Sequence, residues 1–311
     1  MSVARLEITD LLWPVNSDGE RLPVAKAEVL TALTAAGQRR AVRIVSRMPA
    51  ANGLLDAGYV DALGLRVHCE LQRLSEELQM GRRVAALLGP TIDDLRAADR
   101  WDPATEGAKP TTAPPPIRVV DIGCGLGYVV RWLAATAALG DDVELVGVDL
   151  NPALIGQASK LAEREALDCR FVPGDALELG VGVEDGPRTV VMSTGLLHHL
   201  PEPGLAEFFA AHERLEVAAF AHWDISPCVF ATLGAWALHQ IRMREPVSRH
   251  DGVMSARRAH PASVLQAAAY AGAPGYAIRI IEEAHWRSGA LDVLRPIVGR
   301  RPGSGAPERA A

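Results

Sequence analysis

The sequence predicts a doubly wound α/β fold, with a mostly parallel seven-stranded sheet and an N-terminal helical cap. Three observations support this prediction. Short apolar runs alternate with helix-length segments after residue 116, a glycine-rich turn follows the first run, and 49% of the 311 residues are hydrophobic, which is enough for a large core. Nearly continuous apolar strands are typical of a parallel sheet covered on both faces. Ligands of such a sheet bind at the carboxyl ends of its strands.

Seven segments are predicted to form the sheet. The five runs expected to be parallel strands are 117–121, 143–149, 169–172, 189–193 and 216–224. Two later runs, 276–283 and 290–298, are joined by a short polar stretch and predict a closing antiparallel hairpin. Between the second and third strands, residues 153–166 have the length and pattern of a helix.

The first hundred residues are predicted to be mainly helical. Apolar residues recur at helical spacing between residues 67 and 78, and a second helical pattern over 24–45 is interrupted at Gly37. Residues 102–116 contain five prolines and no large apolar side chain, which predicts a linker. The predicted organisation is therefore a cap over 1–101, the linker over 102–116, the sheet domain over 117–300 and a disordered tail over 301–311.

Composition and charge restrict the partners. A net charge of −6 argues against a broad surface for nucleic-acid phosphates. The longest apolar run, 228–238, is too short to span a membrane, and the charged residues among the first thirty argue against a signal peptide. The four cysteines form no C-x-x-C pair, which predicts reduced thiols. We expect a cytoplasmic protein with a small-molecule substrate and without nucleic-acid or membrane partners, whose oligomeric state does not follow from the sequence.

The stretch V-V-D-I-G-C-G-L-G-Y places a carboxylate and three glycines at the end of the first strand. Free backbone N–H groups at a helix start are compatible with a pyrophosphate. The spacing differs from the dinucleotide fingerprint, however, because the third glycine comes one residue early and Tyr128 occupies its place. Asp121 would repel a pyrophosphate and attract an ammonium group. The loop therefore favours a ligand with a cationic end.

Residues 117–225 resemble the class I S-adenosylmethionine-dependent methyltransferases, whose first motif is a D-x-G-x-G-x-G loop like D-I-G-C-G-L-G here. The resemblance implies that the domain over 117–300 is a methyltransferase with S-adenosylmethionine as its cofactor. It also implies that Gly123 and Gly125 let the backbone approach the methionine part of the cofactor. By the same resemblance, Asp121 helps to hold the amino group of that part.

The same resemblance assigns roles to residues after the next two strands. Asp149 ends the second strand, where such enzymes use an acidic residue to accept both ribose hydroxyls, and Leu150 would pack on adenine. Asp175 is similar to the acceptor for the exocyclic amine of adenine, with Ala176 beside it. Three carboxylates at three successive strand ends make a coherent cofactor site.

Adjacent histidines follow the fourth strand in S-T-G-L-L-H-H-L-P-E-P, a segment similar to the one in the same place in the family. His198 is predicted to face the cofactor or substrate side and is a candidate base, whereas His199 is interpreted as structural. Neighbours in sequence point in different directions, and no cysteine or acidic partner has a ligand-like spacing. No metal is therefore predicted.

Further catalytic candidates lie where substrate loops of this fold are expected. His222 and Asp224 are at the end of the fifth strand, and His250 and Asp251 lie in the polar stretch 248–261, which is predicted to be a loop. A histidine could take the proton of a phenol, hydroxyl or amine acceptor. His198, His222 and His250 are accordingly the predicted catalytic residues.

The predicted reaction is O-, N- or C-methylation of a small, largely apolar metabolite. Aromatic residues grouped after the fifth strand and the absence of a strongly basic composition support this acceptor class. Two alternatives remain open. An NAD(P)-dependent oxidoreductase shares the strand, glycine turn and helix, although Asp121 and Tyr128 count against it. A methyltransferase-like cofactor-binding or regulatory subunit without turnover would share the same fold.

Overall fold

The structure is a computed structural model that forms two compact units. It describes residues 5–14, 16, 21–100, 116–176, 188–227, 239–281 and 294–302. The helical unit comprises residues 1–74 and 225–261, and the sheet unit comprises residues 75–224 and 262–311.

These boundaries differ from the predicted organisation. Helix α5 (Met80–Arg100), which the sequence predicts as part of the cap, belongs to the sheet unit. Residues 225–261 group with the N-terminal helices instead of with the sheet. Most of the predicted linker and most of the predicted tail lie outside the described residues, and so does the apolar run 228–238.

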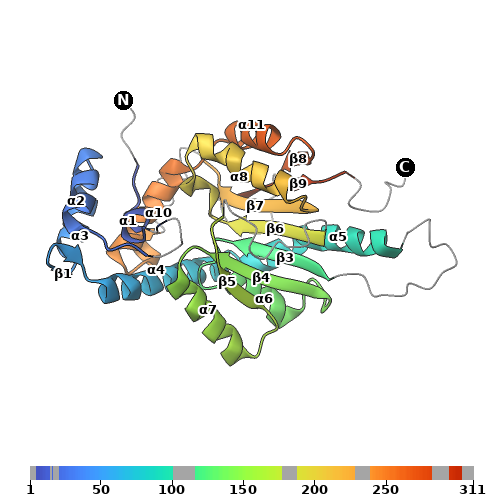
Figure 1. The fold of residues 1–311 in the computed structure, drawn as a ribbon, viewed down its shortest axis with the longest axis horizontal. Coiled ribbons are helices and arrows are strands. Elements are labelled where there is room, and N and C mark those ends of the chain that lie inside the picture. Colours follow the sequence, from blue (N-terminus) through green and yellow to red (C-terminus); the bar gives the residue numbers. More distant parts are fainter. Residues whose placement is uncertain are drawn as a thin grey trace. The chain divides into compact units, whose positions relative to one another are not determined.

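A seven-stranded, mostly parallel sheet forms the centre of the sheet unit (Figure 1), as the sequence predicts. Its strands are β3 (Ile117–Ile122), β4 (Val143–Asp149), β5 (Arg170–Pro173), β6 (Thr189–Thr194), β7 (Ala219–Ile225), β8 (Ala277–Ile280) and β9 (Leu294–Arg300). The order is β5-β4-β3-β6-β7-β9-β8. Strands β3 to β7 pair in parallel, and β8 and β9 form the predicted antiparallel pair. The carboxyl ends of β3 to β7 therefore share one edge of the sheet.

Helices cover both faces of this sheet. They are α5, α6 (Tyr128–Thr136), α7 (Pro152–Glu165), the 3₁₀ turn η3 (Leu197–His199), α8 (Glu202–Arg214) and α11 (Ala262–Gly272). One core packs α5, α6 and α7 on one face, and a second core packs α8 and α11 on the other. Helix α7 starts one residue before the predicted start, because Pro152 occupies its first turn and the Asn151 side chain accepts the Ala153 N–H at 3.0 Å.

The helical unit is built around its own apolar cluster. Its elements are α1 (Ile8–Leu12), α2 (Lys26–Ala35), α3 (Arg39–Ser46), β1 (Ala50–Ala51), β2 (Leu54–Leu55), α4 (Ala57–Glu77), which continues into the sheet unit, and α10 (Pro246–Arg258). The predicted interruption at Gly37 is confirmed, since this residue has a φ of +67° between α2 and α3.

The predicted substrate loop over 248–261 is wrong for most of its length, because these residues form helix α10. Pro246 lies in the first turn of α10, where its missing N–H costs no hydrogen bond. The buried carboxylate of Glu70 accepts backbone N–H groups of Arg244 and Glu245 just before the helix, the shortest at 2.6 Å.

Among the described residues, no helix has both the length and the apolar character needed to cross a bilayer.

Candidate functional site

In the glycine loop between β3 and α6, every second residue has a left-handed backbone conformation. Gly123, Gly125 and Gly127 have φ values of +71°, +56° and +69°, a region that other residues adopt only with strain. At Gly127 a side chain is also excluded by space, since a Cβ would lie 2.2 Å from the ring of Phe171. The Gly123 N–H donates to the Val148 carbonyl at 2.8 Å and ties the loop to β4. The backbone conformation of the loop therefore requires glycine at these three positions of the D-x-G-x-G-x-G motif.

Asp121 is a buried carboxylate directly before this loop. It is 2% exposed, and its Oδ1 atom is buried without a hydrogen-bond partner among the described residues. Burial, and secondly the nearby charge of Asp149, raise the pKa of Asp121 to about 8. A buried carboxylate oxygen without a partner is costly unless a ligand satisfies it. An ammonium group would satisfy it, because it brings both a donor and a positive charge.

Asp149 connects the glycine loop to the start of α7. Its Oδ2 accepts the Gly125 N–H and its Oδ1 accepts the Asn151 N–H, both at 2.9 Å. Each carboxylate oxygen has a second lone pair that remains able to accept a hydroxyl. Asp149 thus holds the glycine loop in place. Its side chain is only partly buried, so a ligand can also reach it.

The register of the strands brings the predicted carboxylates to neighbouring positions. Asp121 pairs with Gly147, and Asp149 pairs with Pro173, so the ends of β3, β4 and β5 lie side by side. Asp175 follows β5 and is exposed. Leu150 is 41% exposed, and Ala176 is partly buried against the core under α8. The exposed apolar side chain of Leu150, next to these carboxylates, is suited to pack against a flat, apolar group of a ligand.

His198 lies on the turn η3, after β6, and is held by Asp224 at the end of β7. The ring Nδ1 of His198 is 2.7 Å from Asp224 Oδ1, and the backbone N–H of His198 donates to Asp224 Oδ2 at 2.6 Å. Both side chains are buried. Because Nδ1–H donates to the carboxylate, the basic lone pair of the neutral ring is on Nε2. A histidine oriented by a carboxylate in this way is a common arrangement for a general base.

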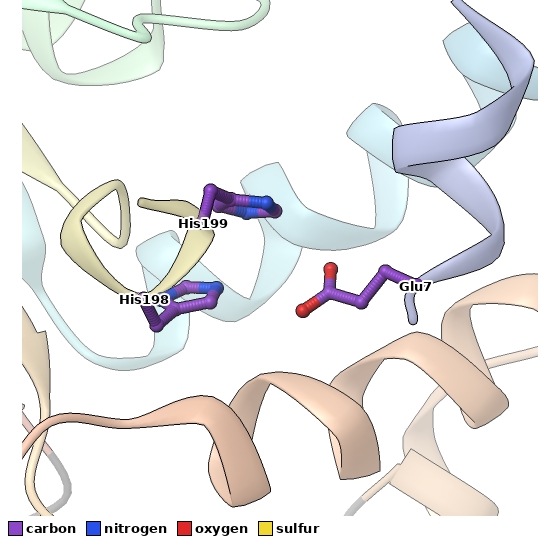
Figure 2. Close-up of side chains that lie close together, drawn as sticks. All are labelled: Glu7, His198 and His199. Atoms are coloured by element: carbon purple, nitrogen blue, oxygen red, sulfur yellow. The ribbon is translucent and has the colours of Figure 1, made fainter. Parts of the chain in front are cut away.

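The neighbouring His199 lies beside His198 on the same turn (Figure 2). The centroids of the two rings are 4.3 Å apart, and the ring planes are tilted by 37°. Glu7, which Figure 2 also labels, is a residue of the helical unit. Asp224 binds the ring of His198.

His222 is in the core under α8 and not at the strand ends. It is fully buried among phenylalanine rings, and its Nδ1 lies 2.9 Å from Ser193 Oγ. Its Nε2 lies 3.1 Å from Nε2 of His212, whose Nδ1 is 2.8 Å from the Phe208 carbonyl. Burial, and secondly His212, hold the pKa of His222 well below its usual range. This position separates His222 from the candidate base His198.

His250 belongs to the helical unit, where it lies on α10 and is buried. Its Nδ1 is 2.7 Å from Oδ1 of Asp251. The Asp251 carboxylate also accepts the backbone N–H groups of Ile8 and Thr9, each at 2.9 Å, at the start of α1. Within this unit, Asp251 therefore joins α10 to α1, and His250 binds Asp251.

The pairing of His198 with Asp224 was not predicted, although both residues were separate candidates. The partners are 26 residues apart, and their contact depends on the parallel pairing of β6 with β7. The available signal was that each residue lies at the end of an apolar run, or just after one, at the same predicted edge of the sheet.

Cys124 is a second feature that the sequence did not indicate. Burial and the charges of Asp149 and Asp121 raise the pKa of its thiol well above the usual range.

Comparisons with known proteins find similarity in the central segment. A family described as a methyltransferase domain matches residues 119–215. Tocopherol O-methyltransferase of Arabidopsis thaliana, a chloroplastic protein, is 29% identical over 116 residues, which cover 35% of this chain and 32% of that protein. The chain thus matches about a third of the length of this curated relative.

Two solved structures are similar at lower sequence identity. Magnesium protoporphyrin IX methyltransferase from Synechocystis PCC 6803, with bound S-adenosylhomocysteine, is 16% identical at a TM-score of 0.46, with 89% of this chain and 99% of that chain covered. The methyltransferase domain of bacterial CtHen1-C is 15% identical at a TM-score of 0.47, with 73% and 98% covered.

Proposed function

We propose that this chain, whose residues 119–215 match a methyltransferase-domain family, is a class I methyltransferase that uses S-adenosylmethionine as its cofactor and methylates a small, largely apolar metabolite on oxygen, nitrogen or carbon. The observation that supports it most is Asp121, a buried carboxylate with an unpaired oxygen beside a left-handed glycine loop. An ammonium group would stabilise the ionised form of Asp121, whereas the pyrophosphate of a nicotinamide cofactor would oppose its ionisation and supply no opposite charge. This contrast favours the methyltransferase over the oxidoreductase alternative.

The proposed cofactor site uses the residues at the ends of β3, β4 and β5. Asp121, Gly123 and Gly125 would hold the amino-acid end of S-adenosylmethionine. Asp149 would accept the ribose hydroxyls, because each of its oxygens keeps a lone pair after binding a backbone N–H.

The adenine would bind further along the same edge. Leu150 would pack against the ring, and Asp175 with Ala176 would recognise its exocyclic amine. The cofactor supplies a methyl group on a sulfonium, which is an activated leaving group, so the protein mainly aligns the acceptor and excludes water.

His198 is the proposed base for the acceptor. Asp224 holds its Nδ1–H, so the acceptor proton would pass to Nε2 as the methyl group is transferred. The Asp224 carboxylate would then stabilise the imidazolium that forms. His222 and His250 are not part of this proposal, because His222 is buried in the core under α8 and the buried His250 is bound by Asp251 on α10.

The charges of the residues at the strand ends support the proposed class of methyl acceptor. The five residues after each of the strands β3 to β7 include no lysine or arginine, whereas carboxylates occur at four of the five strand ends. A carboxylate or phosphate on the acceptor would meet no opposite charge from these residues. A neutral metabolite with one polar, proton-bearing group is the best fit, and we propose it as the partner in place of a nucleic acid.

Turnover with labelled cofactor tests this function. The full chain is incubated with S-adenosylmethionine that carries a tritiated methyl group and, separately, with bulk RNA, a protein extract and a small-molecule extract. We expect label in the organic-soluble fraction with the wild type, and with a control variant at an exposed acidic residue, Asp168→Ala, but not with Asp149→Ala. Label mainly in RNA or protein would refute the acceptor class. Binding of cofactor without transfer to any fraction would favour the regulatory alternative.

A further inference from the structure

Trp223 is a large side chain in β7 whose indole nitrogen has an unusual environment. Its side chain is fully buried, and its indole Nε1 is buried without a hydrogen-bond partner among the described residues. Indole nitrogen is only a donor, and a buried tryptophan usually finds an acceptor for it. The described part of the chain therefore contains a donor at the end of β7 that its own residues do not satisfy.

The position of Trp223 relates this donor to Asp121. In the sheet, Asp121 pairs with Met192 of β6, which pairs with Ala221 of β7, and Trp223 is two residues further along. Side chains two residues apart point to the same face of a strand. Trp223, Ala221 and Met192 share the core under α5 and α6, as does Val119, two residues before Asp121. Asp121 and Trp223 thus face the same side of the sheet near its carboxyl edge.

The two unpaired atoms have opposite hydrogen-bonding character. Asp121 Oδ1 is an acceptor and Trp223 Nε1 is a donor. Standard sheet spacings place the two Cα atoms about 12 Å apart, on the same face of the sheet. An α-amino acid group carries an ammonium donor and a carboxylate acceptor on one carbon, which is the combination that this pair lacks. A ligand with only an amine would satisfy Asp121 alone.

We propose that the Trp223 indole N–H binds the carboxylate of the cofactor's amino-acid end, while Asp121 binds its ammonium group. This inference rests on the proposed function and makes Trp223 a specificity-determining residue for the intact amino acid. The described strand-end residues offer the carboxylate no guanidinium or ammonium group, so an indole N–H is a chemically suitable donor there. Trp223 would bind the cofactor without taking part in the transfer itself.

Binding of two matched ligands to Trp223→Phe tests the proposal. Calorimetry measures the affinity of the full chain for S-adenosylmethionine and for decarboxylated S-adenosylmethionine, which lacks only the carboxylate. We expect Trp223→Phe to weaken the binding of S-adenosylmethionine about tenfold and to leave the decarboxylated ligand unchanged, since one charge-assisted hydrogen bond is lost. The control Trp132→Phe changes a partly buried tryptophan of the same core, and we expect both affinities to stay as in the wild type.

A second variant covers the case in which phenylalanine packs badly. Incorporation of β-(3-benzothienyl)alanine at position 223 keeps the bicyclic ring and removes only the N–H. We expect the same selective loss for S-adenosylmethionine and an unchanged melting temperature, because no protein hydrogen bond is broken. An equal effect on both ligands, or no effect on either, would overturn the role of Trp223. If the wild type binds neither ligand, the proposed function fails instead.

Discussion

Buried histidines lie in two regions of the sheet unit, and the partners of each region differ. At the strand ends, His198 is bound by the carboxylate of Asp224. In the core under α8, His222 and His212 are bound by each other, by Ser193 and by a backbone carbonyl. Both regions are buried. Only the first supplies a negative charge that can stabilise a protonated ring.

The hydrogen bonds of the core region determine which nitrogens carry protons. His212 Nδ1–H donates to the Phe208 carbonyl, so its Nε2 is an acceptor. His222 must then donate from Nε2 and accept from Ser193 at Nδ1. Burial lowers the pKa of His212 to about 4. These two rings are neutral structural groups at neutral pH, and the contrast shows that burial alone does not make a histidine a base.

The largest expected effect is at the strand ends. Replacing His198 by glutamine, or Asp224 by asparagine, should lower kcat by roughly 100- to 10,000-fold, because the acceptor proton loses its oriented base. The affinity for S-adenosylmethionine should change little. Steady-state kinetics and calorimetry on the same samples test this, with His199→Gln as the matched control. If His199→Gln lowers kcat as much as His198→Gln, the pairing with Asp224 does not define the base.

A somewhat smaller effect is expected at Asp149. Asp149→Ala would remove the two charge-assisted hydrogen bonds that we propose to the ribose, at a cost on the order of 2–4 kcal/mol, or roughly 30- to 1000-fold in cofactor affinity. Part of this loss would come from the glycine loop, since Asp149 also binds the Gly125 N–H. Calorimetry with Asp168→Ala as the control measures it. Unchanged affinity in a folded Asp149→Ala protein would remove Asp149 from the site.

The core histidines should affect stability and not turnover. The folded pKa of His212 is lowered, so the unfolded chain binds the proton first as the pH falls. Stability is therefore complete above about pH 6.5 and is lost toward pH 4, by about 3 kcal/mol for this residue. Urea unfolding at several pH values should show a smaller loss in His212→Gln than in the wild type. Equal pH dependence in both proteins would show that His212 is not the group that titrates.

The local patterns in the sequence predicted the sheet well. The apolar runs became β3 to β9 with small shifts at their ends, and the glycine loop has the left-handed residues that its spacing requires. Both features depend on residues close in sequence. The same holds for the break at Gly37 between α2 and α3.

Contacts between distant segments were not predictable in this way. The polar residues of α10 indicated an exposed loop, but Asp251 binds the start of α1, which is more than 240 residues away. His222 was expected near the acceptor, yet its partner His212 on α8 keeps it in the core. The buried pair of His198 and Asp224 likewise depends on strand register. In each case a polar residue has a buried partner that no local pattern reveals.

The most direct test of the central claim is the affinity for S-adenosylmethionine measured by calorimetry as a function of pH. Burial and the charge of Asp149 raise the pKa of Asp121 to about 8, and we propose that its ionised form binds the ammonium group. Affinity should therefore rise as the pH increases from 6, by nearly tenfold per unit at first, pass through a maximum near pH 8, and fall at higher pH as the ammonium group of the cofactor loses its proton. Asp121→Asn should bind weakly without this dependence. Binding of NAD in place of S-adenosylmethionine, or an affinity that does not change with pH, would contradict the account.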